Sequence, residues 1–273
     1  MPTSTYSHIN TVCAYLQEAR PKSFLDVGLG NGKIGFIARD LLDVMLGEKY
    51  HRKDWKVKID GIEIFPDYIQ EHQKAIYNDI YIGNALEVID GLGKYDMVYI
   101  GDVLEHFEKE DGWMMLDKMA DHSSAYMIVS VPLGENWTQP PIYGNPHEEH
   151  KSFWKLEELE HYSIAKELLN FPKIGQYGTF LIRRNEFIHA RAREVAEAMY
   201  ADGKGEAAIE FMVNRIEDLP PDIMSEYVVV DFLLNLKKLK EAHKRLTEAA
   251  KLFPGEEVIK QHLAQLEKVL NTA

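Results

Sequence analysis

Short apolar runs alternate with more polar segments along the first two thirds of the chain. Short, nearly continuous apolar runs are typical of strands that are covered on both faces of a sheet. Helical segments, such as Lys33 to Leu46, lie between the earlier runs. We expect the last two runs to pair as an antiparallel hairpin at the sheet edge. The pattern predicts an α/β fold with a doubly wound sheet of seven strands, at residues 23–27, 57–62, 79–82, 95–100, 126–131, 171–177 and 179–183.

The pattern becomes helical from Phe187 to the end of the chain. Ala208 and Pro220 recur 34 residues later as Ala242 and Pro254. This is the period of tetratricopeptide repeats, in which a small residue lies where paired helices touch. An unrelated helical bundle stays open as the alternative, because Ala192 and Ala196 replace the aromatic residue and the glycine that are usual in the first helix. We therefore expect two domains: residues 1–185, and an all-α domain of helical repeats at 186–273, in which residues 256–271 form a cap helix.

The first predicted strand ends in an acidic residue and alternate glycines, Asp26-Val27-Gly28-Leu29-Gly30-Asn31-Gly32. Glycines at this position let the backbone turn tightly and approach a ligand closely. The spacing from Gly30 to Gly35 also matches the dinucleotide pattern, so the glycines alone do not select a cofactor. A carboxylate at Asp26 would repel a pyrophosphate and attract a cation such as the sulfonium end of S-adenosylmethionine. Asp26 therefore favours that cofactor over NAD.

Polar residues also follow the next strands, where a doubly wound sheet places its ligand contacts. Glu63 ends the second predicted strand and is positioned to accept hydrogen bonds from ribose hydroxyls, with a solvated loop acid as the alternative. Asn84, after the third strand, is expected to contact adenine, to cap the helix that begins at Ala85, or to do both. Gly101 and Asp102 follow the fourth strand.

These segments resemble the successive motifs of class I S-adenosylmethionine-dependent methyltransferases. The resemblance covers residues 8–184 and implies a Rossmann-like seven-stranded methyltransferase sheet. In that family the glycine loop holds the methionine end of the cofactor, the acid after strand two holds the ribose, and the pair after strand three flanks the adenine. Asn84 departs from the family pattern, which most often has Asp at this position. The cofactor residues implied here are Asp26, Gly28, Gly30, Glu63, Ile64, Asn84, Ala85, Gly101 and Asp102.

Two histidines are the candidate catalytic residues. Methyl transfer needs an aligned nucleophile and at most one base. His106 follows the fourth strand, beside Asp102 and Glu105, and its alternative role is that of a packed or capping histidine. His150, together with Trp154, belongs to a long segment where substrate lids occur.

A metal site was also considered in that segment. Its candidate ligands are His147, Glu149 and His150. Their spacing lacks the i, i+4 histidine pair of helical zinc sites, so we expect no metal.

Composition limits the class of partner. The chain has 273 residues and a net charge of −13, with excess acid in both halves, which disfavours a nucleic-acid footprint. A single cysteine, Cys13, excludes an internal disulfide, and no apolar run is long enough to span a membrane. We expect a cytoplasmic enzyme.

The basic segment 47–56 is interpreted as a solvated loop, with a docking surface as the alternative.

The sequence therefore predicts an S-adenosylmethionine-dependent methyltransferase that acts on an oxygen or nitrogen of a small-molecule acceptor. One alternative is a protein methyltransferase that recruits its substrate through the helical tail. Another is a non-catalytic scaffold that binds S-adenosylmethionine. The tail is also expected to bind a protein partner or to mediate self-association.

Overall fold

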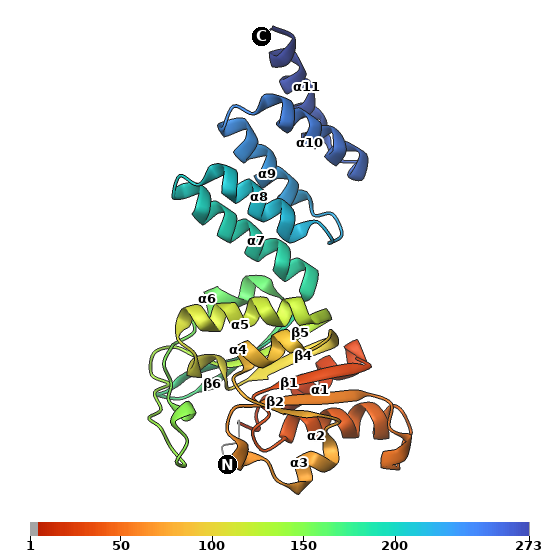
Figure 1. Cartoon of the computed structure of the whole chain (residues 1–273), viewed down its shortest axis with the longest axis vertical. Helices are drawn as coiled ribbons and strands as arrows, with labels where there is room; N and C mark the ends of the chain where they lie inside the picture. Colours follow the sequence, from red (N-terminus) through yellow and green to blue (C-terminus); the bar gives the residue numbers. More distant parts are fainter. Residues whose placement is uncertain (1–4, 273) are drawn as a thin grey trace. The chain divides into compact units, whose positions relative to one another are not determined.

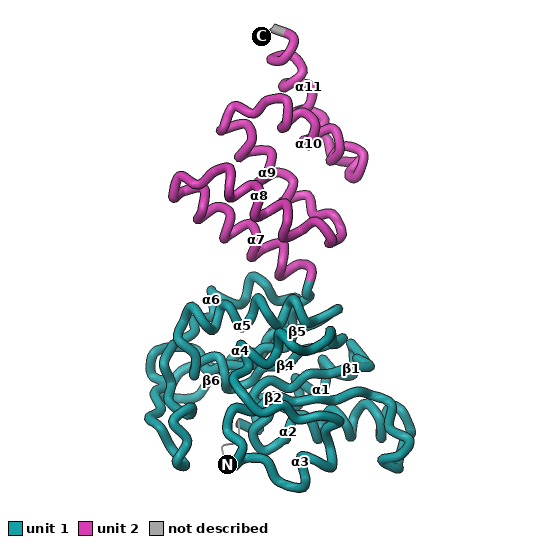
Figure 2. Tube along the Cα trace, in the orientation of Figure 1, with its two compact units in different colours: residues 1–184 teal, residues 185–273 magenta. Residues whose placement is uncertain are grey.

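The computed structural model describes residues 5–272 and divides the chain into two compact units (Figures 1 and 2). The first comprises residues 1–184 and the second residues 185–273. Each unit has its own apolar core. Among the helices of residues 5–272, not one combines the length and apolar character that a membrane crossing requires.

The first unit is built on a seven-stranded sheet within the described residues, in the order β3-β2-β1-β4-β5-β7-β6. β7 runs antiparallel to both of its neighbours, and the other paired strands are parallel. This confirms the predicted Rossmann-like fold. β1 lies between β2 and β4, so the chain reverses its direction of winding beside β1. The strands are β1 (Ser23–Val27), β2 (Lys58–Glu63), β3 (Ile80–Ile82), β4 (Tyr95–Gly101), β5 (Ser123–Leu133), β6 (Ser163–Phe171) and β7 (Gly175–Arg183).

The two strands at the β6 edge differ from the prediction. The expected antiparallel hairpin at the sheet edge is present, but its strands have other bounds. Residues 175–183 form one strand, β7, that continues through Gly178 and pairs with β6, which ends at Phe171. A Cβ at Gly178 would lie 2.5 Å from the Phe180 ring, so the glycine marks close packing rather than a turn. β6 was missed because it is an edge strand with partly exposed side chains and no continuous apolar run.

Helices cover both faces of this sheet (Figure 1). α1, α2 and α3 lie on one face, and α4 and α5 lie on the other. α2 continues into a π-helical stretch, Asp40–Met45, so the predicted helix 33–46 is present with a change of winding. The helices of this unit are α1 (Ile9–Ala19), α2 (Lys33–Arg39), α3 (Glu71–Ile76), α4 (Ala85–Val88), α5 (Lys109–His122) and α6 (Leu156–Leu159).

The basic segment 47–56 is fastened to this π-helical stretch. The buried Asp43 carboxylate accepts hydrogen bonds from the backbone N–H groups of Lys56 and Val57 and pairs with Arg39. The Arg39 guanidinium also lies 4.6 Å from the centre of the Trp55 ring. The carboxyl end of the segment is therefore held by the buried Arg39–Asp43 ion pair and by a cation–π contact.

The second unit is helical over its described residues. Its helices are α7 (Arg184–Ala201), α8 (Gly205–Ile216), α9 (Ile223–Asn235), α10 (Leu239–Leu252) and α11 (Glu257–Thr272). α10 begins 34 residues after α8, and each is preceded by a turn with a residue at positive φ, Gly203 and Lys237 respectively. Equivalent backbone hydrogen bonds close the two turns, at Lys204–Met199 and at Lys238–Leu233. The 34-residue period is thus a structural repetition as well as a sequence one.

A buried hydrogen-bond chain holds the glycine loop of the first unit. The Tyr77 hydroxyl donates to the Asp26 carboxylate at 2.5 Å and accepts from the Gly35 backbone N–H at 3.2 Å. A Cβ at Gly35 would lie 2.1 Å from the Tyr77 ring, so glycine is required there. Burial raises the pKa of Asp26 to about 7, although the hydrogen bond from Tyr77 opposes this shift.

This shift predicts a pH dependence of stability. Between about pH 4 and 7 the folded protein retains a proton on Asp26 that the unfolded chain has released, so the free energy of unfolding should fall as the pH rises. In Asp26→Asn this contribution is absent. The difference in unfolding free energy between parent and variant should therefore change by up to about 4 kcal/mol across this range, as measured by urea unfolding.

Asp67→Asn is the matched control, because Asp67 is exposed, and it should keep the parental pH slope. Identical slopes for the parent and Asp26→Asn would show that Asp26 ionises normally in the folded state.

Candidate functional site

A cavity of about 730 Å³ lies at the carboxyl edge of the sheet. It is lined by the loops that follow β1, β2, β3 and β4, together with residues of the segment between β5 and α6. Its lining residues lie between Thr5 and Tyr177, within the first unit. The volume is in the range of small-molecule sites, and the position is where doubly wound sheets bind ligands.

The glycine loop forms one wall of this cavity. Gly28, Gly30 and Gly32 all have positive φ angles, of 73°, 50° and 78°. The backbone N–H groups of Gly28 and Leu29 donate to the Ile62 carbonyl at the end of β2. The loop is therefore a tight turn fixed to the neighbouring strand, and Gly28 and Gly30 line the cavity.

Glu63 joins this loop to β2. One carboxylate oxygen accepts from the Gly30 N–H and the other from the Phe65 N–H, each at 2.9 Å. The residue is 5% exposed. Burial raises the pKa of Glu63, and the Glu148 charge adds to this, while the two backbone hydrogen bonds oppose it. A carboxylate held in this way still has lone pairs for ribose hydroxyls.

Asn84 caps α4, as one of its two predicted roles required. Its side-chain oxygen accepts from the Leu86 N–H at 3.1 Å. The amide nitrogen is then the group through which Asn84 can contact a ligand. Ile64 and Ala85 line the cavity beside it and provide apolar contact surface.

The turn after β4 brings further predicted residues to the cavity. Asp102 has a positive φ of 53°, and its backbone N–H donates to the Ser130 carbonyl at 3.0 Å. A Cβ at Gly101 would lie 2.0 Å from the Tyr99 hydroxyl, so the strand can leave the sheet there only as glycine. Gly101 and Asp102 both line the cavity.

His106 and His150 lie side by side in the cavity wall, with ring centres 5.0 Å apart. His106 Nδ1 is 3.0 Å from the Glu149 carbonyl, and His150 Nδ1 is 2.8 Å from the Trp137 carbonyl. Because a carbonyl only accepts, each Nδ1 carries a proton, and in the singly protonated form of each ring the lone pair is on Nε2. Burial lowers the pKa of His106 to about 4, and His150 adds to this shift.

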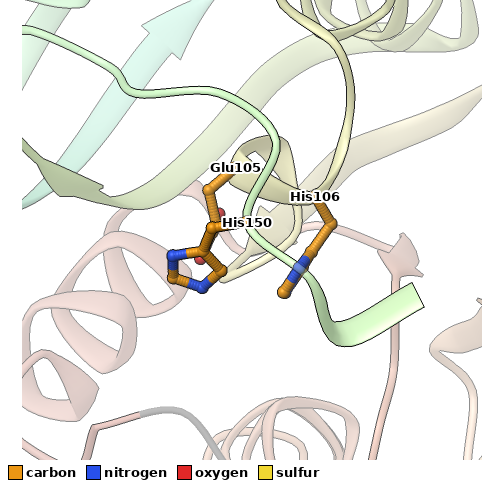
Figure 3. A group of neighbouring side chains, drawn as sticks. All are labelled: Glu105, His106 and His150. Carbon is orange, nitrogen blue, oxygen red and sulfur yellow. The ribbon is translucent and has the colours of Figure 1, made fainter. Parts of the chain in front are cut away.

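Backbone pairing places His150 next to His106. The Lys151 and Ser152 N–H groups donate to the Glu105 carbonyl, at 2.8 and 3.1 Å. Glu105 itself is 3% exposed and has a carboxylate oxygen, Oε2, without a hydrogen-bond partner. Burial and the Asp102 charge raise the pKa of Glu105 well above its ordinary value. Figure 3 shows Glu105 and His106 on one turn and His150 on the adjacent segment.

Asp26 is the predicted cofactor residue that does not line the cavity. Its carboxylate points into the protein interior, where it accepts a hydrogen bond from Tyr77. With a pKa of about 7, the group is only partly ionised at neutral pH. We therefore revise its role from attracting a cationic ligand to fixing the glycine loop. The predicted residues that do line the cavity are Gly28, Gly30, Glu63, Ile64, Asn84, Ala85, Gly101, Asp102, His106 and His150.

A second polar cluster in the wall was missed. Glu148, which is 7% exposed, accepts from the Tyr68 hydroxyl at 3.0 Å and from the Asn145 side chain at 3.3 Å. The cluster joins the turn after β2 to the long segment after β5, so residues 80 positions apart meet. The sequence shows only that the long segment after β5 is rich in acids and histidines. That composition does not indicate that Glu148 contacts Tyr68.

Comparisons with known proteins give solved structures of methyltransferases. Magnesium protoporphyrin IX methyltransferase from Synechocystis PCC 6803, with bound SAH, is 15% identical over 67% of this chain and 90% of that chain, with a TM-score of 0.44. TehB from Haemophilus influenzae is 14% identical over 66% and 63% of the two chains, with a TM-score of 0.46.

The 1,6-didemethyltoxoflavin-N1-methyltransferase of Burkholderia thailandensis is 17% identical over 65% and 78%, with a TM-score of 0.43. No protein-family model matches the chain, and neither does a curated protein sequence.

The sheet order, the single strand antiparallel to its neighbours and the glycine loop at the carboxyl edge are properties of the chain itself. The first unit therefore has the Rossmann-like fold of class I S-adenosylmethionine-dependent methyltransferases.

Proposed function

We propose that this protein transfers a methyl group from S-adenosylmethionine to an oxygen or nitrogen of a small-molecule acceptor. The observation that carries this proposal is the cavity at the carboxyl edge. Its lining includes a glycine loop, a carboxylate placed to bind ribose, and two adjacent histidines. The residues proposed to bind the cofactor and those proposed to contact the acceptor thus line the same cavity.

The residues of the glycine loop and of the loops after β2 and β3 fit the proposed cofactor. Glu63 would accept hydrogen bonds from the ribose hydroxyls, Ile64 and Ala85 would pack on the adenine, and Gly28 and Gly30 would allow close backbone approach. When bound, the cofactor supplies a methyl group on a sulfonium: its carbon–sulfur bond breaks with the electron pair left on sulfur, a bond to the acceptor forms, and the acceptor proton passes to solvent. No metal or reductant is required by this balance.

The histidines would position the acceptor. At neutral pH the His106 ring is uncharged, so its Nε2 accepts a hydrogen bond from an acceptor O–H or N–H group. A ring with a pKa of about 4 is a weak base, because an efficient general base has a pKa near the working pH. Alignment of the nucleophile therefore supplies more of the rate than proton removal does.

Charge around the cavity favours a neutral or cationic acceptor. Glu63, Asp102 and Glu148 all line it, and the whole chain carries a net charge of −13. A polyanion would be repelled by this field.

A chain with one cysteine, Cys13, suits a reducing compartment, and we place the enzyme in the cytoplasm.

The second unit is proposed to be a tetratricopeptide-like recognition or assembly module. The 34-residue structural repetition supports this, as does the complete burial of Ala208 and Ala242 at equivalent positions. It would bind a protein partner or a second copy of the chain. Recruitment of a protein substrate through this unit is the alternative function that the tail suggests.

The cofactor assignment predicts the effect of Glu63→Ala. Loss of charge-assisted hydrogen bonds to ribose should weaken S-adenosylhomocysteine binding by about 1–3 kcal/mol, or roughly 5- to 150-fold, in calorimetry. Asp102 and Glu148 in the cavity wall would repel the pyrophosphate of NAD, so the parent should bind NAD at least about 100-fold more weakly than S-adenosylhomocysteine.

The matched control is Glu71→Ala, which removes an exposed carboxylate on α3 and should leave the affinity unchanged. Parental affinity in Glu63→Ala, with the fold intact by circular dichroism, would refute the ribose assignment. Tight NAD binding would refute the choice of cofactor.

The domain assignment predicts that residues 1–184 bind the cofactor alone. The cavity lining and one apolar core belong to this unit, so S-adenosylhomocysteine affinity should stay within about threefold of the full chain. Light scattering of both proteins would show whether the tail carries self-association. A soluble, folded 1–184 protein that does not bind would mean that the site requires the helical unit.

A further inference from the structure

We propose that Glu105, His106 and His150 form a binding site for one divalent transition-metal ion in the cavity wall. One donor atom from each of these three side chains lies within 4.8 Å of the other two (Figure 3). The sequence predicted no metal, and its candidate ligands were His147, Glu149 and His150. The structure brings together two imidazoles and one carboxylate, a donor set that is common for zinc and for non-haem iron.

The hydrogen bonds of the two histidines leave the correct atoms for a metal. Each Nδ1–H donates to a backbone carbonyl, that of Glu149 for His106 and that of Trp137 for His150. Metal-binding histidines are usually oriented in this way, because the bond at one nitrogen directs the lone pair of the other toward the ion. Glu149 thus acts through its carbonyl, as a support, rather than through its carboxylate as a ligand.

Glu105 provides an independent indication. Its side chain is 3% exposed, lines the cavity, and has Oε2 without a hydrogen-bond partner. A buried polar atom without a partner is costly, and such atoms need an explanation. A cation held also by His106 and His150 would satisfy this oxygen. The neighbouring acids Asp102 and Glu148 add a negative field that attracts positive ions.

The nature of the donors indicates which ions would bind. Two imidazole nitrogens favour Zn²⁺, Fe²⁺ or Co²⁺ over Mg²⁺ and Ca²⁺, which prefer oxygen ligands. Donors around a tetrahedral Zn²⁺ lie about 3.4 Å apart for bonds of about 2.1 Å, so the side chains would close in by roughly 1 Å. Three protein ligands leave at least one position open, facing the cavity.

An open position suggests a role that rests on the proposed function. With the ion bound, His106 Nε2 would coordinate the ion instead of the acceptor. A hydroxyl oxygen of the acceptor would then bind at the open position, and the ion would lower the pKa of that hydroxyl so that its proton leaves to water near neutral pH. This supplies what the weakly basic His106 does not. It also narrows the acceptor from an oxygen or nitrogen nucleophile to a hydroxyl group.

The test is a titration of the chelator-treated full chain with Co²⁺, followed by visible absorption and calorimetry. We expect one ion per chain and a spectrum with imidazole coordination. In His106→Ala and in His150→Ala the affinity should fall at least about 100-fold, because losing a ligand costs no less than losing the residue that orients one. Glu105→Gln, which keeps the shape but not the charge, should weaken binding about 10-fold or more.

Two histidine variants serve as controls. His147→Ala removes a cavity residue outside the cluster, and His51→Ala removes an exposed one, so both should bind Co²⁺ as the parent does. Sub-stoichiometric binding by the parent, unchanged affinity in His106→Ala and His150→Ala, or loss of binding in His147→Ala would each overturn the site. His106→Gln and His150→Asn provide replacements if an alanine variant does not fold.

Binding of S-adenosylhomocysteine to the same proteins separates this inference from the proposed function. Cofactor binding without Co²⁺ binding overturns the metal site and leaves methyl transfer standing. Co²⁺ binding without cofactor binding supports the metal site and refutes the methyltransferase.

Discussion

The attachment of the glycine loop to the end of β2 is the constraint on which the site depends. Gly28 and Leu29 donate to the Ile62 carbonyl, and Glu63 accepts from Gly30. These bonds fix the turn at the point where the sheet changes its direction of winding. From the opposite side, Tyr77 holds Asp26 and the start of α2. The loop is therefore shaped before any ligand binds, which reduces the entropy cost of binding.

Buried carboxyl groups are the second feature of this fold. Asp26, Glu63 and Glu105 are each nearly excluded from water, and burial raises the pKa of all three. They differ in what offsets that burial. Asp26 has a tyrosine hydroxyl, Glu63 has two backbone amides, and Glu105 retains an oxygen without a partner. Asp26 therefore supports the loop, whereas Glu63 and Glu105 remain available to ligands.

The centre of the sheet was predictable from sequence, and its edge was not. β1, β4 and β5 are covered on both faces, so each forms an apolar run that can be recognised. β6 is an edge strand with half-exposed side chains, and Gly178 was interpreted as a break although it is paired within β7. The cofactor loops followed from the strand ends, because parallel strands bring their carboxyl ends to one edge. By contrast, the contact of His150 with His106 depends on backbone bonds between Glu105 and residues 151–152, which leave no pattern in the sequence.

We propose that the cofactor binds along the loops after β1, β2 and β3. Amide hydrogen exchange of the full chain, with and without saturating S-adenosylhomocysteine, tests this most directly. We expect slowed exchange in residues 28–32, 63–65 and 84–86 when the ligand is bound. Slowed exchange confined to residues 185–273, or none in the three loops at saturation, would contradict it.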